Sequence, residues 1–481
     1  MESDDQSNNG FPVPTRVSRM RRFPTPPDLE KILPRYQLAS SAAHARVLMA
    51  SGLIKAEVVD QIVTGLEQIG QEFAAGKHFI NDDDIDLYTA LIRRLSELTG
   101  TVGERLNQGR SDEDWLATDV RLWVRDTLLD ALLKLIELRT MFLQLATAHE
   151  DVFFSAYTHM QPKRREMLCF HFLSVESRLR QDCERFLDLF GRVNLISAGL
   201  DNQILLEHPL DRGLLARLLG FDGIQHNTFD SVSEVDYVIE FASCAAIFGT
   251  HLSQFAGEML LWSTQEFGLV RLPRQFSFEN ETFPDRKSSE VLEVLRSRSA
   301  SLGYKLTEIL SQLKGIPSAS SHESSEVLSA LNELIYNLDF VLELTKTILP
   351  ALIFDIKRMT DLSEVDMANR ANAIDYLIEK GFAPDKAVSL VEPLVEYCRK
   401  RKRTMSDLAP GEWMQFSPAF DRDIYKYVSK DESLGTSGPR YELVSQAIGY
   451  GRQRLAHDHE QLAALSSKVK SLTVEVPTTT E

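Results

Sequence analysis

The sequence has few cysteines, and none in a pattern that binds metal. Zinc sites and disulfide-rich domains need paired or closely spaced cysteines. We expect neither here and interpret the scattered cysteines as reduced core thiols: Cys169, Cys183, Cys244 and Cys398. His457 and His459 have metal-like spacing, but they lie in a polar stretch that we expect to form a C-terminal helix. No metal site is therefore predicted.

Long apolar runs are also missing. No run reaches the roughly 18 to 20 residues that a membrane-spanning helix needs. The first residues contain no apolar signal core, and Glu2, Asp4 and Asp5 argue against a transit peptide. We therefore expect a soluble, cytoplasmic protein with no membrane partner.

Positive charge is in deficit. The chain has 53 lysines and arginines against 70 acidic residues, for a formal net charge of −17. Such a chain repels the phosphates of nucleic acid, so no nucleic-acid partner is expected. A glycine-rich phosphate loop and a G-x-S-x-G nucleophile turn are absent as well. We predict no cofactor.

Few stretches alternate with period two, whereas two long stretches show a helical repeat. From Val124 to Leu145, and again from Phe241 to Trp262, apolar residues step alternately by four and three positions. This spacing forms an apolar seam along one side of a helix about 30 Å or more in length. Helices of that length need long partners, which a bundle provides.

We therefore predict an all-α fold with three helical regions around a long central bundle. A capping turn at Asn81–Asp84 should precede a helix through Tyr88. The predicted regions are a flexible basic, proline-rich arm at 1–30, an N-terminal helical domain at 31–112, a central bundle domain at 113–361, a small C-terminal helical domain at 362–465 and a polar tail at 466–481.

Several segments resemble the argininosuccinate lyase family, within the fumarase/aspartase superfamily. Gly109–Trp123 is similar to the family's G-R-S-R-N-D-Q-V-A-T-D-x-R-L-W, and Thr158–Gln161 matches T-H-x-Q. Leu261–Gly268 is similar to L-W-S-S-Q-E-F-G. Ser277–Arg296, hereafter the signature segment, resembles S-T-G-S-S-x-M-P-Q-K-K-N-P-D-x-x-E-L-I-R. The resemblance extends from about Leu38 to Arg454.

The resemblance implies a homotetramer with a core of about twenty helices. Each active site in that family draws on three subunits and acts on a small-molecule substrate. The family's reaction removes a proton from the carbon next to a carboxylate and expels a nitrogen leaving group, giving fumarate. It needs a base, an acid and donors for the developing negative charge.

Part of the family's site is retained. The resemblance makes His159 the acid or its relay, and it assigns Thr158, Gln161, Ser111 and Lys287 to substrate binding. An alternative interpretation is that His159 is a histidine at the start of a helix, inherited with the fold.

Other positions differ from the family. Asn280 and Glu281 replace the serine pair that contains the base, Arg286 replaces a carboxylate-binding lysine, and Ser288 replaces an asparagine. An amide cannot accept a proton at neutral pH. Glu281 or Glu279 can, if desolvation raises the pKa of the carboxylate. Alternatively, these glutamates belong to a solvated acidic loop.

Acids also replace donors near the start of the first long helix. Asp112 and Glu113 stand where the family has an arginine and an asparagine that contact substrate carboxylates, and Asp86 stands where a histidine is usual. Each lost charge-assisted hydrogen bond costs about 2–5 kcal/mol. We therefore do not expect cleavage of argininosuccinate.

Two hypotheses remain open. In the first, the protein is a repurposed lyase that breaks a C–N or related bond in another amino-acid-derived substrate. In the second, it is an inactive tetramer with a structural or regulatory role. We favour the enzyme because Thr158, His159 and the cation at Arg286 are retained together.

Overall fold

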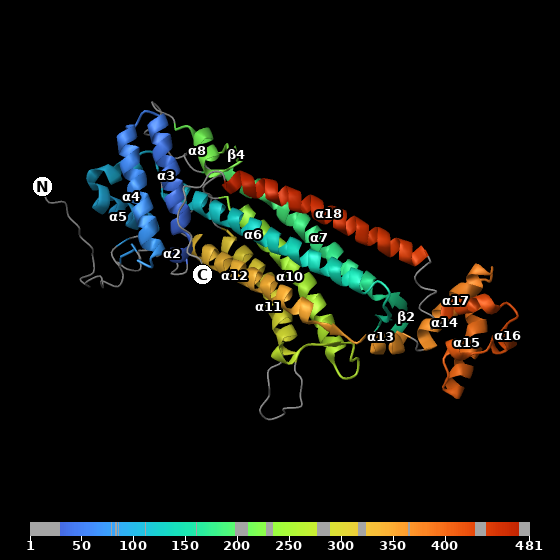
Figure 1. Ribbon diagram of the computed structural model, residues 1–481. Helices are drawn as coiled ribbons and strands as arrows, with labels where there is room; N and C mark the ends of the chain where they lie inside the picture. Colours follow the sequence, from blue (N-terminus) through green and yellow to red (C-terminus); the bar gives the residue numbers. More distant parts are fainter. Residues whose placement is uncertain are drawn as a thin grey trace, which may run out of the picture.

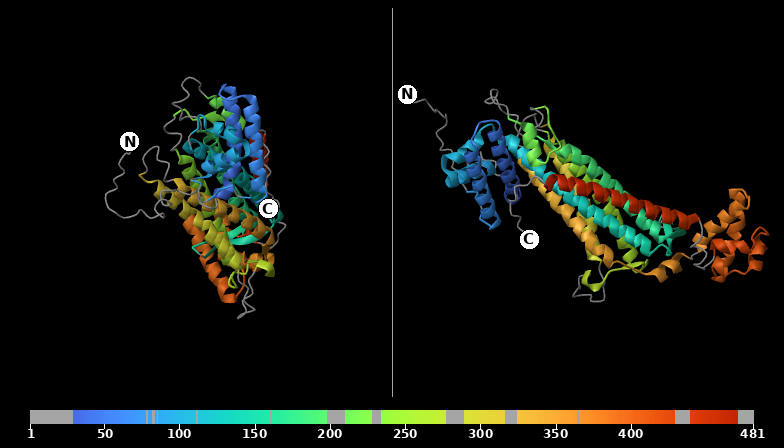
Figure 2. Two further views of the ribbon diagram at one scale, coloured as in Figure 1. Left: turned by 90° about the vertical axis from the view of Figure 1, so that its left-hand side faces the viewer. Right: turned by 45° about the horizontal axis from the view of Figure 1, so that its top comes forward.

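The computed structural model describes residues 29–77, 79–81, 84, 86–110, 112–159, 161–197, 210–227, 234–276, 289–315, 324–363, 366–428 and 439–470. The molecule is elongated, with a bundle of long helices at its centre (Figure 1). Small groups of helices from the N-terminal and C-terminal parts of the chain lie at its two ends (Figure 2).

The long helices carry the seams that the sequence predicts. Both seams are buried in one continuous hydrophobic core, apart from Leu145, which packs against it half-buried. At Gly249, an added Cβ would lie 2.4 Å from the Ser299 carbonyl oxygen, so this glycine lets two helices approach closely. The bundle helices are α6 (Asp112–Ala148), α7 (Leu168–Val193), α10 (Asp236–Ser263), α11 (Glu290–Leu313), α12 (Ser324–Ile348) and α18 (Pro439–Lys470).

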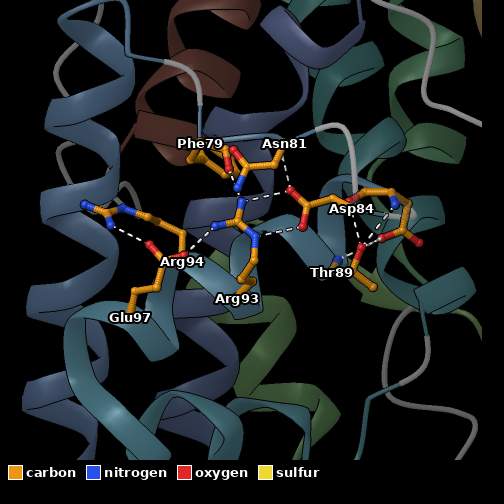
Figure 3. Close-up of polar contacts among 8 residues, drawn as sticks. Phe79, Asn81, Asp84, Thr89, Arg93, Arg94 and Glu97 are labelled. Carbon is orange, nitrogen blue, oxygen red and sulfur yellow. Dashed lines mark hydrogen bonds and ion pairs between the residues drawn. The ribbon is translucent and has the colours of Figure 1, made fainter.

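A polar turn is tied to α5 (Leu87–Thr99) in the N-terminal group (Figure 3). The Asn81 N–H donates to the Asp84 carboxylate at 2.7 Å, and Arg93 donates to both Asp84 oxygens at 2.8 Å. This confirms the turn predicted ahead of the helix through Tyr88, but the predicted capping role of Asn81–Asp84 is wrong, because Asp86 caps this helix. The elements here are α2 (Leu29–Ile32), α3 (Pro34–Ala50), α4 (Ala56–Ala74), α5 (Leu87–Thr99), η1 (Gly100–Asn107) and, from later in the chain, α8 (Arg212–Leu219).

The C-terminal group has a separate small core around Tyr376, Trp413 and Phe420. Its helices are short, as the sequence predicts: α13 (Ile356–Ser363), α14 (Asp366–Glu379), α15 (Pro384–Arg401), η5 (Met405–Asp407), α16 (Pro410–Phe416), η6 (Arg422–Ile424) and α17 (Tyr425–Val428). The predicted domain boundaries stay a prediction. Helix α18, which they assign to the C-terminal domain, packs along α6 and α7.

The all-α prediction is confirmed, although it overlooked short strands. The longest pair, β1 (Phe153–Thr158) and β2 (Gln161–Met167), forms an antiparallel hairpin between α6 and α7. The remaining short elements are β3 (Leu195–Ile196), β4 (Gly223–Ile224), β5 (Val270–Arg271), η3 (Arg274–Phe276), η4 (Leu349–Ala351) and β6 (Ile353–Phe354). None of the described helices combines the length and apolar character needed to span a bilayer.

A buried charge cluster fastens α18 to the bundle. Arg139 of α6 is fully buried, and its guanidinium donates to Glu176 of α7 at 3.0 Å and to Asp458 of α18. Asp458 is also fully buried. Removing one partner from such a cluster leaves charge in a medium that solvates it poorly.

We therefore expect Asp458→Ala to lower the free energy of unfolding by about 3–5 kcal/mol in chemical denaturation. The control is Glu396→Ala, which removes an exposed ion pair with Arg399 and should cost less than about 1 kcal/mol. Equal losses in the two variants would contradict the role given to the buried cluster.

Candidate active site

The hairpin between α6 and α7 presents His159 at its tip. A bulge shifts the strand pairing between Ala156 and Tyr157, after which Thr158 pairs with Gln161. Only residues 159 and 160 are left to make the turn. The φ angle of His159 is +54°, a positive value that the favoured two-residue hairpin turns require at their first position.

His159 is therefore a turn residue, and the interpretation of it as a helix-start histidine is wrong. Helix α7 begins only at Leu168, after β2. A positive φ is unfavourable for most side chains, although asparagine, aspartate and histidine adopt it more readily than others. The imidazole is exposed in the protomer, where it is available to a ligand or a neighbouring subunit.

The described part of the signature segment, 289–296, begins at this same end of the bundle. Phe154 of β1 packs edge to face on Trp262, near the end of α10, with ring centroids 5.6 Å apart. The next residue, Ser263, accepts a hydrogen bond at 3.0 Å from Ser289, which precedes α11. The predicted site residues of this segment lie outside the described residues: Glu279, Asn280, Glu281, Arg286, Lys287 and Ser288.

The acids that replace the family's donors lie far from the hairpin in the same chain. Asp112 and Glu113 occupy the first turn of α6, and the hairpin follows the other end of that helix. Helix α6 has 37 residues and is therefore about 55 Å long. Figure 1 shows β2 at the opposite end of the bundle from α4 and α5. One protomer thus does not bring His159 together with Asp112.

Four of the predicted site residues are placed by their backbone alone. Thr158 and Gln161 pair through their strands, and Asp112 and Glu113 are helical, but the side chains of all four lie outside the described residues, as does the whole of Ser111. Asp86 has a clear local role, because its carboxylate accepts a hydrogen bond from the Thr89 N–H at 2.8 Å and caps α5. A replacement acid can therefore serve the fold.

Sequence reasoning missed a buried polar cluster close to the start of α6. Arg110 donates to Ser41 of α3 at 3.0 Å and stacks over Trp115. The same tryptophan packs edge to face on His44, whose Nε2 lies 2.9 Å from the Gln108 carbonyl oxygen. The sequence feature that could have predicted this cluster is the set of polar residues inside helix α3, which is otherwise apolar. The cluster ties α3 to the segment that leads into Asp112.

Asp119 is the buried carboxyl in this cluster. Burial raises its pKa to about 7, opposed by a hydrogen bond from Ser40 and by the charge of Arg110. Burial also lowers the pKa of His44 to about 3, and Arg110 contributes in the same direction. His44 is therefore neutral near pH 7, whereas Asp119 is divided between its two protonation states.

Solved structures show which class of fold this is. EDDS lyase in complex with formate superposes with a TM-score of 0.79 and 23% identity, over 92% of this chain and 90% of that one. Class II fumarase from Schistosoma mansoni superposes with a TM-score of 0.65 and 14% identity, over 85% and 91%. The fold is that of the fumarase/aspartase superfamily.

Sequence comparison gives the family. A family model described as lyase matches residues 20–279. Argininosuccinate lyase of Thermosynechococcus vestitus is 34% identical, covering 87% of this chain and 92% of that protein. The enzyme of Gloeobacter violaceus is 33% identical, covering 89% and 92%. The chain belongs to the argininosuccinate lyase family, which confirms the resemblance found in the sequence.

The raised pKa of Asp119 predicts a pH-dependent stability. Between about pH 4 and 7 the folded state retains a proton that the unfolded state has released, so the free energy of unfolding falls as pH rises. Asp119→Asn removes this titration. Relative to that of wild type, the free energy of unfolding of the variant should rise by about 3–4 kcal/mol between pH 4 and pH 8, as measured in denaturant titrations.

The matched control is Asp60→Asn, at an exposed position on α4, which should track the wild type across this range. If the difference between Asp119→Asn and wild type stays constant with pH, Asp119 does not titrate in this window.

Proposed function

We propose that this protein is a repurposed lyase that eliminates a C–N or related bond from an amino-acid-derived substrate other than argininosuccinate. His159 acts as the acid or its relay for the leaving group. Glu281 or Glu279 removes the proton next to a carboxylate, and Arg286 holds one carboxylate. The remaining substrate contacts are Thr158, Gln161, Ser111, Asn280, Lys287 and Ser288.

The observation that carries this proposal is the backbone of His159. Its positive φ costs conformational energy, and a glycine or asparagine would make the same turn more easily. The turn alone therefore does not account for histidine at this position. An exposed imidazole can donate or relay a proton to a bound ligand.

The acids near α6 support a change of substrate. Asp112 and Glu113 favour a substrate that is less anionic than argininosuccinate or that carries an amine, because like charges repel. The fold also accommodates a lyase named for a different substrate, EDDS, and a variant of that enzyme has been determined with bound fumarate. Changes of substrate within this architecture therefore have a precedent.

The length of α6 supports a site shared between subunits. Asp112 lies in the first turn of α6 and His159 beyond its other end, and the helix is about 55 Å long, so a site that uses both requires neighbouring copies. We propose a homotetramer in which the hairpin of one subunit meets the signature segment and the start of α6 from others. Localisation in the cytoplasm fits such a metabolic lyase.

The first test is a metabolite screen that follows ultraviolet absorbance from a new conjugated alkene. His159→Asn is the informative variant, because asparagine tolerates the positive φ and leaves the hairpin intact. We expect it to lose about 100-fold or more of the activity. Lys402→Asn is the matched control, since Lys402 also has a positive φ (+52°) but lies in the C-terminal group.

The same absorbance profile for wild type and for His159→Asn would favour the inactive-scaffold hypothesis over the proposal. Incubation with argininosuccinate is run in parallel, and clear release of fumarate would overturn the exclusion of the family's own substrate.

The second test addresses the shared site. His159→Asn and the double variant Glu279→Gln, Glu281→Gln should each be inactive as pure tetramers. Co-expressed with different affinity tags, they should form mixed tetramers in which some sites combine a wild-type hairpin with a wild-type signature segment, so part of the activity returns. Mixed tetramers that stay inactive would contradict a site shared in this way.

A further inference from the structure

A half-buried aromatic pair lies just below the tip of the His159 hairpin. Tyr157, two residues before His159, packs edge to face on Phe267, with ring centroids 5.5 Å apart and an interplanar angle of 65°. Phe267 belongs to the turn that follows α10. The strand pairing shifts between Ala156 and Tyr157. Tyr157 is therefore the residue at which the hairpin changes register before its turn.

The turn that carries Phe267 is held by hydrogen bonds from α13 and by one hydrogen bond within the turn. The Arg358 guanidinium of α13 donates to the carbonyl oxygens of Phe267 and Glu266, at 3.2 and 3.3 Å. The N–H of Gly268, a glycine with a φ of +61°, donates to the Thr264 carbonyl at 2.7 Å. These hydrogen bonds fix the backbone that carries the Phe267 ring, on which the Tyr157 ring packs.

Helix α13 is itself anchored next to this turn. The Asp355 N–H donates to the Leu269 carbonyl at 2.9 Å, and the Asp355 carboxylate accepts from the Arg358 N–H at 2.9 Å. Helix α13 also packs along β1. A continuous set of contacts thus leads from α13 through the Phe267 turn to Tyr157.

We propose that Tyr157, Phe267 and Arg358 are positioning residues for His159. They fix the position and orientation of the hairpin tip relative to the bundle, and they make no contact with the reacting atoms. The catalytic part of this inference rests on the function proposed above, in which His159 transfers a proton. A displacement of about 1 Å in such a group can cost up to about 100-fold in rate.

Phe267→Ala tests the inference on the full-length protein. The matched control is Phe416→Ala, because Phe416 is also half-buried and forms a similar edge-to-face pair with Tyr397 (5.3 Å, 72°) in the C-terminal group. The readout is the rate at which diethyl pyrocarbonate modifies His159, followed by peptide mass spectrometry. His171 is the internal control, since its side chain is only 12% exposed and reacts appreciably only if the bundle opens.

We expect Phe267→Ala to change the modification rate of His159 beyond replicate scatter while His171 stays protected. Phe416→Ala should leave His159 as in wild type, and Tyr157→Phe, which keeps the ring, should do the same. If His171 becomes reactive in Phe267→Ala, the variant Phe267→Leu is used in its place. Leucine fills the space but makes no edge-to-face ring contact. An unchanged His159 rate in the folded variant, or an equal change in Phe416→Ala, overturns the inference.

Once a substrate is known, Phe267→Ala should lower kcat about 10- to 100-fold and change KM much less. Equal losses in kcat for Phe416→Ala would reveal a general effect of destabilisation and count against positioning. If no substrate is turned over by any variant, the proposed function fails, while the modification rates of His159 still decide whether the three residues position it.

Discussion

The length of helix α6 is the constraint on which the rest of this structure depends. Its apolar seam requires long partners, so α7, α12 and α18 pack along it, and α10 and α11 pack on α7 and α12 to complete the bundle. The same helix, about 55 Å long, separates the acids in its first turn from the hairpin that follows its other end. The proposed site uses residues from both ends of this helix, and it therefore calls for neighbouring copies of the chain.

The two ends of the bundle are organised by different forces. At the hairpin end, ring contacts involving Phe154, Tyr157, Trp262 and Phe267 set the strands against the end of α10. At the other end, polar groups are buried close to the start of α6, and burial keeps His44 neutral and raises the pKa of Asp119. The candidate site therefore combines a part positioned by packing with a part positioned by buried hydrogen bonds.

Much of the fold follows from sequence, because helical seams are local patterns. The stretches 124–145 and 241–262 predicted two long helices, and the polar residues Asn81–Asp84 predicted the turn ahead of α5. The hairpin at 153–167 was missed, since its strands lack a clear period-two pattern and the bulge at Ala156 and Tyr157 interrupts their register. The pairing of Arg139 with Asp458 joins residues 319 positions apart, which no local pattern reveals.

The candidate site was only partly predictable, because its residues were assigned by similarity to a family while their surroundings depend on tertiary contacts. The central claim is that His159 and a carboxylate of the signature segment form one proton-transfer site across a subunit interface. The most direct measurement is a high-resolution structure of the assembled protein. The account predicts Glu281 or Glu279 of a neighbouring subunit within hydrogen-bond reach of the His159 ring, directly or through one water. Both carboxylates directed into solvent and away from His159 would contradict it.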